Sequence, residues 1–190
     1  MSKFRTVFNL LIPSQCLLCK RHGWTLCETC LDDLQPFGHR AVRKDLAGYS
    51  LTGYSESVPG LISSFKEQGI TELASRLVSR LDTAQLVELL SQWIPANQTL
   101  FLVPVPSSLT AMRTRGFNPA EQVAAALRNR LLAVAKEIAE LGELQQIRVA
   151  RVLERKLVVA DQASLNLTGR WLNQAGSMAV RHSVSGMSCL

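Results

Sequence analysis

The chain has 190 residues, of which 47% are hydrophobic and 19% are charged. This composition is that of a globular protein long enough to bury an apolar core, and it excludes a low-complexity chain. The net charge of +6 is modest, but positive charge collects in two later segments, residues 101–130 and 146–190. A site for an anion requires such segregation, although a solvated mixed surface would show the same counts.

The first segment, MSKFRTVFNLLIPSQC, has two basic residues followed by an apolar run. Asn9 interrupts the run, Pro13 closes it, and no small-residue cleavage site follows, so we predict a packed helix rather than a signal peptide. No stretch approaches the roughly 20 apolar residues that cross a bilayer. We therefore expect a cytoplasmic protein without a membrane span.

Two C-x-x-C pairs follow in CLLCKRHGWTLCETC, which runs from Cys16 to Cys30. Two such pairs can direct four thiolates toward one Zn²⁺ ion, here Cys16, Cys19, Cys27 and Cys30. A redox C-x-x-C or two disulfides are the alternatives, but a redox motif occurs once and a cytosolic chain disfavours disulfides. Since cysteine fills all four positions, we predict a structural zinc without a catalytic coordination site.

The next segments predict a division into three parts. Residues 1–36 form the zinc knuckle with flanking helices, and a polar, glycine-containing linker spans 37–53. Residues 54–190 form the main domain, which starts with helices between Ser57 and Trp93. Ser57 and Pro59 signal the start of the first of these helices, and Gly69 signals its end.

The middle of the chain predicts an α/β domain. QTLFLVPVP is a short apolar run stopped by prolines, which favours a buried parallel strand at residues 100–105. A loop over 106–118 and a helix over 119–141 come next, and Asn118 is in position to cap that helix. IRVARVLERKLVVA alternates partly like a strand, and SLNLTGRWLNQ is a turn-rich stretch with room for one helical turn. Strand, loop, helix and strand in this order are typical of α/β folds.

The loop before the long helix is the candidate anion site. In open α/β sheets, ligands bind where the strands end and the helices begin. The amino end of a helix favours an anion, and Arg113 and Arg115 add full positive charges. Gly116 would let the backbone approach a phosphate closely. A surface loop with two solvated arginines is the alternative, and no Walker phosphate loop occurs in the chain.

Four features together resemble the ComF family of competence-associated proteins, GntX-like members included. They are the double C-x-x-C knuckle, FKEQGITELASRL, PVPSSLTAMRTRGFNPAEQVA and RVLERKLVVADQASLNLTGRWLNQ. Lys66 matches the second motif, whereas Gln68 departs from it. In the last motif the matching residues are Arg155, Lys156, Gln162, Leu165, Arg170 and Asn173.

This family is similar to type I phosphoribosyltransferases, a class of glycosyltransferases, which bind 5-phosphoribosyl-1-diphosphate with Mg²⁺. The resemblance implies an incomplete parallel sheet of that fold, truncated at its C-terminus, beside the zinc knuckle. It implies that residues 151–175 act as a hood over the substrate. The substrate-binding residues that it implies are Lys66, Arg113, Arg115, Gly116, Asn118, Arg155 and Lys156.

One defining element of such enzymes is missing from the sequence. No strand leads into two adjacent acids and a Thr/Gly-rich loop, and the pair Asp32–Asp33 directly follows the knuckle instead. Without that element nothing anchors the ribose hydroxyls or cradles the 5-phosphate, so we expect impaired catalysis and assign no catalytic residue. A truncated product, a fragment and a non-catalytic descendant remain open as explanations.

Two other functions compete with a phosphoribosyltransferase. One is a non-enzymatic interaction protein, linked to DNA uptake or use, that docks partners through the zinc knuckle. The other is a nucleic-acid-binding zinc ribbon. The knuckle carries only Lys20, Arg21 and Trp24 as basic and aromatic residues, so direct nucleic-acid binding is doubtful.

Overall fold

The computed structural model of the protein describes residues 15–34, 39–43, 46–93, 99–137, 146–156 and 165–189. The expected N-terminal helix, the residues around Pro36 and the expected helix end near Gly142 lie outside these ranges. The chain divides into two compact units, Met1–Gln85 and Leu86–Leu190. Within the described ranges, no helix combines the length and the apolar character that crossing a bilayer would need.

The first unit contains short helices and one antiparallel strand pair. Its elements are α2 (Glu28–Asp32), β1 (His39–Arg43), β2 (Leu46–Ser50), α3 (Val58–Glu67), α4 (Glu72–Val78) and the first residues of α5 (Thr83–Trp93). The pair β1–β2 lies in the segment expected to be a linker. Val42 and Tyr49 are residue types that favour strands. The sequence nevertheless predicts a linker, because the segment as a whole is polar.

The helices of the first unit begin and end where their local sequence dictates. Helix α3 follows Ser57 as its N-cap and has a proline in its first turn, as the sequence predicts. The backbone at Gly69 has a φ of +70°, which glycine adopts without the strain that a Cβ would add. Before α5, Asp82 accepts a hydrogen bond from the Gln85 N–H at 2.7 Å, and the Gln85 side chain accepts one from the Asp82 N–H at 3.2 Å. This reciprocal arrangement is a capping box.

Aliphatic side chains from the knuckle and the helices form the core of the first unit. The buried residues of this core are Leu26, Leu31, Leu34, Val58, Leu61, Leu73, Ala74, Val78 and Leu81. Burying a leucine side chain stabilises a fold by about 1.5–3 kcal/mol relative to leaving it exposed. The knuckle and the helices that follow it therefore both contribute buried aliphatic side chains.

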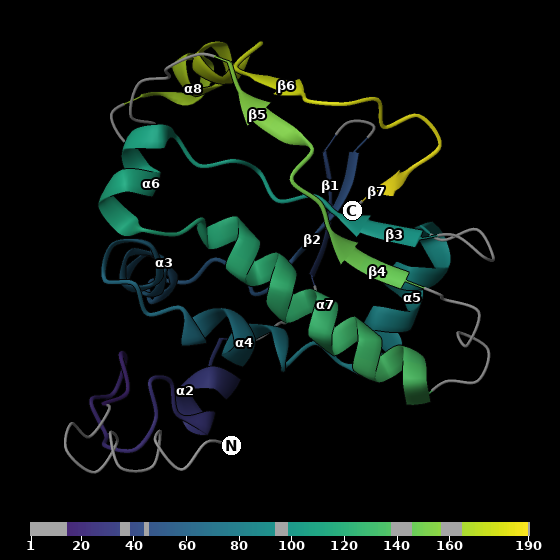
Figure 1. The fold of residues 1–190 in the computed structure, drawn as a ribbon. Coiled ribbons are helices and arrows are strands. Elements are labelled where there is room, and N and C mark those ends of the chain that lie inside the picture. The colour runs from purple at the N-terminus through teal and green to yellow at the C-terminus, as the bar shows by residue number, and fades with distance from the viewer. Residues whose placement is uncertain are drawn as a thin grey trace. The chain divides into compact units, whose positions relative to one another are not determined.

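A small parallel sheet organises the second unit (Figure 1). Strand β3 (Thr99–Leu102) lies in the middle, with β4 (Gln146–Val149) on one side and β7 (Ser188–Cys189) on the other, both parallel to it. The predicted buried parallel strand is confirmed, but it ends at Leu102 rather than at residue 105. Pro104 and Pro106 follow directly, and proline cannot donate to a sheet ladder.

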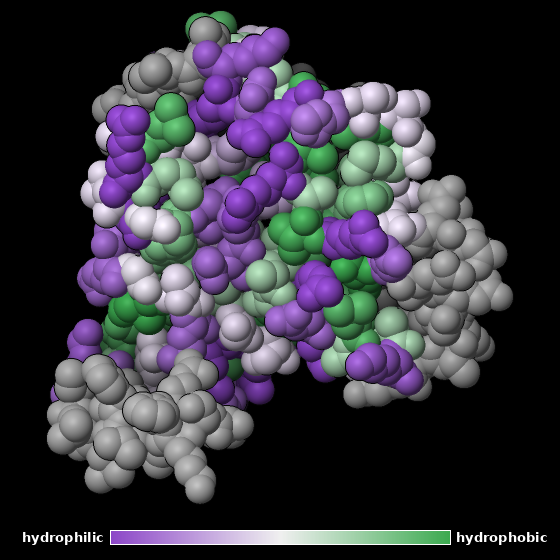
Figure 2. Space-filling view, viewed as in Figure 1, coloured by the Kyte–Doolittle hydropathy of each residue, from purple (hydrophilic) through white to green (hydrophobic). Residues whose placement is uncertain are grey.

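Helix α7 (Pro119–Glu137) packs beside β4, as the sequence pattern predicts for a helix between two parallel strands. Arg128 on this helix donates from Nε to the Ile147 carbonyl at 2.8 Å. The helix buries Ala124, Leu131 and Val134, and it exposes Ala125, Asn129, Ala133 and Lys136. Hydrophilic and hydrophobic residues therefore intermix along the side of α7 that faces the viewer in Figure 2.

The last part of the second unit differs from the sequence-based expectation. The segment expected to alternate as a strand forms two strands in different sheets, β4 and β5 (Leu153–Arg155). Strand β5 pairs antiparallel with β6 (Met178–Val180). Between them, α8 (Leu167–Gln174) is longer than one helical turn. Asn166 caps its start by accepting from the Gly169 N–H at 2.8 Å.

Candidate metal centre and the loop after β3

The first C-x-x-C pair lies on a tight backbone turn. The Cys16 N–H donates to the Arg21 carbonyl at 2.8 Å, and the Lys20 N–H donates to the Cys16 carbonyl at 2.9 Å. Lys20 adopts a φ of +63°, and an isolated antiparallel bridge joins Gln15 to His22. These bonds fold the chain back on itself at Cys19 and orient both thiols of the pair.

The second pair lies at the start of α2. Cys27 is the N-cap residue of this helix, and Cys30 belongs to its first turn. Residues three apart at a helix start lie on the same face, so both thiols point in one direction. The Cys27 N–H approaches the Cys16 sulfur at 3.5 Å, which joins the two halves of the cluster.

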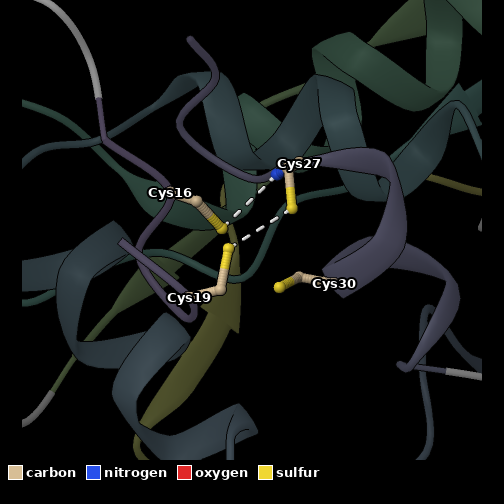
Figure 3. Close-up of side chains that lie close together, drawn as sticks. All are labelled: Cys16, Cys19, Cys27 and Cys30. Carbon is tan, nitrogen blue, oxygen red and sulfur yellow. Dashed lines mark hydrogen bonds between the residues drawn. The ribbon is translucent and has the colours of Figure 1, made fainter. Parts of the chain in front are cut away.

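The four thiols converge on one point (Figure 3). All four sulfur atoms lie within 4.8 Å of one another, and the Cys19 and Cys27 sulfurs are 3.6 Å apart. Tetrahedral zinc with Zn–S bonds of about 2.3 Å requires sulfur–sulfur separations of about 3.8 Å. The cluster can therefore hold a metal ion, and its donor set fits Zn²⁺, since thiolates in this geometry favour that ion.

Local hydrogen bonds set the protonation of the thiols in the absence of a metal. The pKa of Cys19 is lowered to about 6, first because the Arg21 backbone N–H donates to its sulfur and then because the Arg21 guanidinium does. Burial opposes ionisation of Cys16, but backbone N–H groups, that of Cys27 first, lower its pKa on balance. Burial raises the pKa of Cys30 to about 12. Metal binding would deprotonate all four thiols together.

Arg76 of α4 and Arg80, just after its end, hold α2 in place. Arg76 donates to the Leu26 carbonyl at 2.7 Å and to the Glu28 carboxylate at 2.8 Å. Arg80 pairs with Asp32, and it also approaches Glu28 at 3.6 Å. The helix that carries two of the four thiols is thus fastened to the body of the first unit.

Sequence reasoning missed these supporting residues around the cluster. Arg76 also lies over the Trp24 ring, 5.0 Å from its centroid, in a cation–π contact. The signal was present: Glu28 and Asp32 are four residues apart, and so are Arg76 and Arg80. On helix α2 this spacing gives one acidic face. Arg76 of α4 and Arg80, just after its end, supply the matching positive charges.

The segment between β3 and α7 is not the continuous loop expected from the sequence. It contains α6 (Leu109–Arg115), which begins where the Ser108 hydroxyl accepts from the Ala111 N–H at 3.2 Å. Arg113, exposed, and Arg115, half-buried, lie in the last turn of this short helix. Both arginines therefore belong to α6 and do not directly precede the first turn of α7. The negative end of the α6 dipole lies beside their positive charges.

Gly116 and Asn118 shape the connection to α7. Gly116 ends α6 with a φ of +77°, a left-handed conformation that explains the glycine without any ligand. Asn118 is 4% exposed, and its side-chain oxygen accepts from the Ala120 N–H at 3.1 Å and from the Ser107 hydroxyl at 3.0 Å. The capping role predicted for Asn118 is confirmed.

The amino end of α7 already has polar partners inside the protein. Asn118 also donates to the Val105 carbonyl at 3.1 Å. The Glu121 carboxylate, in the first turn of α7, pairs with Arg151 at 2.7 Å. A carboxylate therefore already lies in the first turn of α7, where the helix dipole favours negative charge.

Arg155 and Lys156 lie at the end of β5. Arg155 donates from Nε to the Pro106 carbonyl at 3.0 Å, which brings β5 to the segment after β3. Its Nη1 atom is buried and has no hydrogen-bond partner in the described part of the protein. Lys156 has an exposed side chain, and its backbone N–H donates to the Ser177 carbonyl at 2.8 Å.

The structure brings together some of the residues selected from the sequence. The four cysteines form one cluster in the first unit. Lys66 is exposed in the last turn of α3, also in the first unit. The second unit contains Arg113, Arg115, Gly116, Asn118, Arg155 and Lys156. Of these, Asn118 and Arg155 both contact the segment from Val105 to Ser107.

Comparison with known proteins does not assign the chain to a family. No family model matches it, and a search of curated proteins found no match. The functional argument therefore depends on the cluster, the segment after β3 and the motifs of the sequence.

Proposed function

We propose that this chain is a ComF-like protein of the phosphoribosyltransferase family that binds phosphoribosyl diphosphate or diphosphate. In this proposal the four-cysteine cluster holds a structural zinc, and the second unit supplies the anion-binding groups. The motifs that resemble the ComF family and the mixed α/β fold with a parallel sheet support it. The cytoplasm is the proposed location, because its reducing conditions keep the thiols available to the metal.

The Arg155 guanidinium is the observation that carries the proposal. Buried polar groups in folded proteins nearly always have hydrogen-bond partners, and a buried one without any calls for an explanation such as a bound ion. Arg155 donates from Nε to the Pro106 carbonyl, beside the segment that follows β3. Its Nη1 atom is buried and has no partner among the residues that the structure describes. An anionic oxygen would satisfy Nη1 through a charge-assisted hydrogen bond.

The electrostatics of the second unit favour the same class of ligand. Residues 101–130 contain four arginines and one acidic residue. Arg113 and Arg115 lie in the same last turn of α6, so two positive charges are held on one short helix. Mg²⁺ would accompany the ligand, since diphosphate groups bind this ion through their oxygens.

Turnover in this chain should be very low even if the ligand binds. The sequence has no acid pair leading into a Thr/Gly-rich loop, so ribose and the 5-phosphate would lack their anchors. Catalysis depends on interactions made in the transition state, and these require a fully positioned substrate. We therefore propose a binding protein with impaired catalysis.

Calorimetric titration tests the anion site. Diphosphate and phosphoribosyl diphosphate are titrated in low salt with Mg²⁺ into wild type, Arg155→Ala and the double variant Arg113→Ala, Arg115→Ala. Each arginine–phosphate contact contributes roughly 1.5–3 kcal/mol, so each variant should bind about tenfold more weakly or worse. Arg148→Ala is the matched control for Arg155→Ala, because Arg148 is exposed on β4 and its loss removes the same single positive charge.

The titration has two outcomes that would reject the proposal. Equal affinities for all variants would show that none of these arginines binds the ligand. An absence of binding by wild type would favour the alternative, a zinc-containing interaction or DNA-uptake accessory protein without enzymatic activity. Exposed Trp171 and Leu172 on α8 are the side chains that a protein partner would then bury.

A further inference from the structure

The four cysteines of the cluster differ in how far reagents can reach them. Cys16 is 0% exposed and Cys30 is 7% exposed, whereas Cys27 is half-buried and Cys19 is exposed. Thiolates react with dissolved electrophiles and oxidants according to their access as well as their ionisation. Cys19 is therefore the member of the cluster that a small oxidant reaches first.

A second thiol lies within reach of Cys19, and it belongs to the other C-x-x-C pair. The Cys19 and Cys27 sulfurs are 3.6 Å apart (Figure 3). The Arg21 guanidinium also donates to the Cys19 sulfur, at 3.4 Å. An exposed cysteine with a second cysteine within reach is the arrangement of cysteines that oxidise reversibly.

We propose that Cys19 is a modification site for hydroperoxides, that Cys27 resolves the modified residue, and that the resulting disulfide releases the metal. This inference rests on the metal part of the proposed function and does not depend on the anion site. It names a reaction between the two C-x-x-C pairs rather than within either one.

The reaction proceeds in two balanced steps. The Cys19 thiolate attacks hydrogen peroxide, so an S–O bond forms, the O–O bond breaks and hydroxide leaves with a solvent proton as water. The Cys27 thiolate then attacks the Cys19 sulfur, so an S–S bond forms, the S–O bond breaks and a second hydroxide leaves. The two thiolates lose two electrons in total, and the peroxide gains them.

Loss of the metal follows from the number of ligands that remain. A disulfide sulfur carries no negative charge and is a poor ligand for Zn²⁺. Cys16 and Cys30 would remain as the last two thiolates, whereas a structural zinc requires four protein ligands. One zinc ion should therefore leave for each disulfide formed.

Peroxide treatment of the purified zinc-loaded chain tests the proposal. Zinc release is followed with a chromogenic chelator, and the disulfide is located by tryptic mapping with fragmentation of the linked peptides. Trypsin cleaves after Lys20 and Arg21, so residues 6–20 carry Cys16 and Cys19, and residues 22–40 carry Cys27 and Cys30. A Cys19–Cys27 bond therefore joins two peptides, whereas a bond within a C-x-x-C pair stays inside one.

The expected result is the Cys19–Cys27 linked pair with one zinc released per disulfide, unchanged in the control Cys189→Ser. A disulfide within either peptide, or oxidation of the cluster with zinc retained, would overturn the proposal. Cys19→Ser can lose zinc by itself, so a second measurement uses wild type, namely the order in which N-ethylmaleimide labels the cluster. Cys19 should react at least about tenfold faster than the buried thiols, and earlier labelling of Cys16 or Cys30 would contradict the inference.

The metal content of the starting material separates this inference from the proposed function. A purified chain without zinc would refute the structural zinc. The peptide map of that reduced chain, treated with peroxide in the same way, would still show whether Cys19 and Cys27 form the bond.

Discussion

The cysteine cluster and the segment after β3 are both candidate sites, but they are built in different ways. The cluster is closed within fifteen residues, and all its sulfur atoms lie within 4.8 Å of one another. The polar contacts of the segment after β3 come from several elements. Many of these contacts join one part of the protein to another, as the hydrogen bonds of Asn118 do. A short motif can therefore specify a complete ligand set, whereas a site at a sheet edge depends on how distant elements pack.

The largest expected effect is on the knuckle, through Cys27→Ser. Serine is a favourable N-cap, so the substitution keeps the start of α2 and removes only one ligand. Zinc should fall from one equivalent to well below it, and residues 15–34 should lose hydrogen-exchange protection. Metal binding supplies about 10–16 kcal/mol in small zinc units, which is why the local fold should fail.

This first test has a clear control in Cys189→Ser, which should keep its zinc. Strand β3 of the Cys27→Ser variant should keep its exchange protection, since none of the ligands lies in the second unit. A Cys27→Ser protein with a full equivalent of zinc would contradict the four-ligand site.

The second effect concerns the core of the second unit, through Leu100→Ala. Leu100 is 0% exposed in the central strand, so its truncation leaves a cavity that should cost about 2–5 kcal/mol of unfolding free energy. Leu109→Ala is the matched control, because Leu109 is 76% exposed on α6. Equal losses in urea denaturation would show that β3 is not the centre of this core.

A smaller effect is expected from Asn118→Ala. This change leaves the Val105 carbonyl and the Ala120 N–H without their partner, which should cost about 1–3 kcal/mol. Thermal denaturation measures the loss, with Asn129→Ala on the exposed face of the same helix as control. If both variants unfold at the same temperature, Asn118 does not hold the segment after β3 to α7.

The smallest expected effect is that of Arg80→Ala. The guanidinium pairs with Asp32, a partner that is 57% exposed, so the loss should be about 0.2–1 kcal/mol. The difference from wild type should shrink in about 1 M salt, where charges are screened beyond about 3 Å. The measurement is denaturation in low salt and in high salt, with Arg40→Ala as a control for the loss of one charge. A salt-independent loss would indicate packing of the arginine stem instead.

Features encoded by local pattern could be predicted from the sequence. The apolar run before the prolines predicted β3, and the capped apolar stripe predicted α7. The C-x-x-C spacing predicted that the four thiols lie together. In each case a stretch of about twenty residues contains the whole pattern, either one hydrophobic period or one cysteine spacing.

Features that depend on distant partners could not be predicted. Helix α6 has seven residues, too few for a clear helical period, and its start depends on the Ser108 cap. The division of one apolar segment into β4 and β5 depends on pairing with β3 and β6, which the segment itself does not encode. The same holds for Arg155, whose contact with Pro106 spans 49 residues.

The contacts that fasten α2 to α4 also bear on how the chain is made. Glu28 and Arg76 are 48 residues apart, so at roughly 5–20 residues per second the ribosome delivers the arginine about 2–10 s after the glutamate. During that interval α2 has no partner helix, and five residues do not form a stable helix alone. A metal ion captured by the nascent chain would hold α2 in position until α4 emerges.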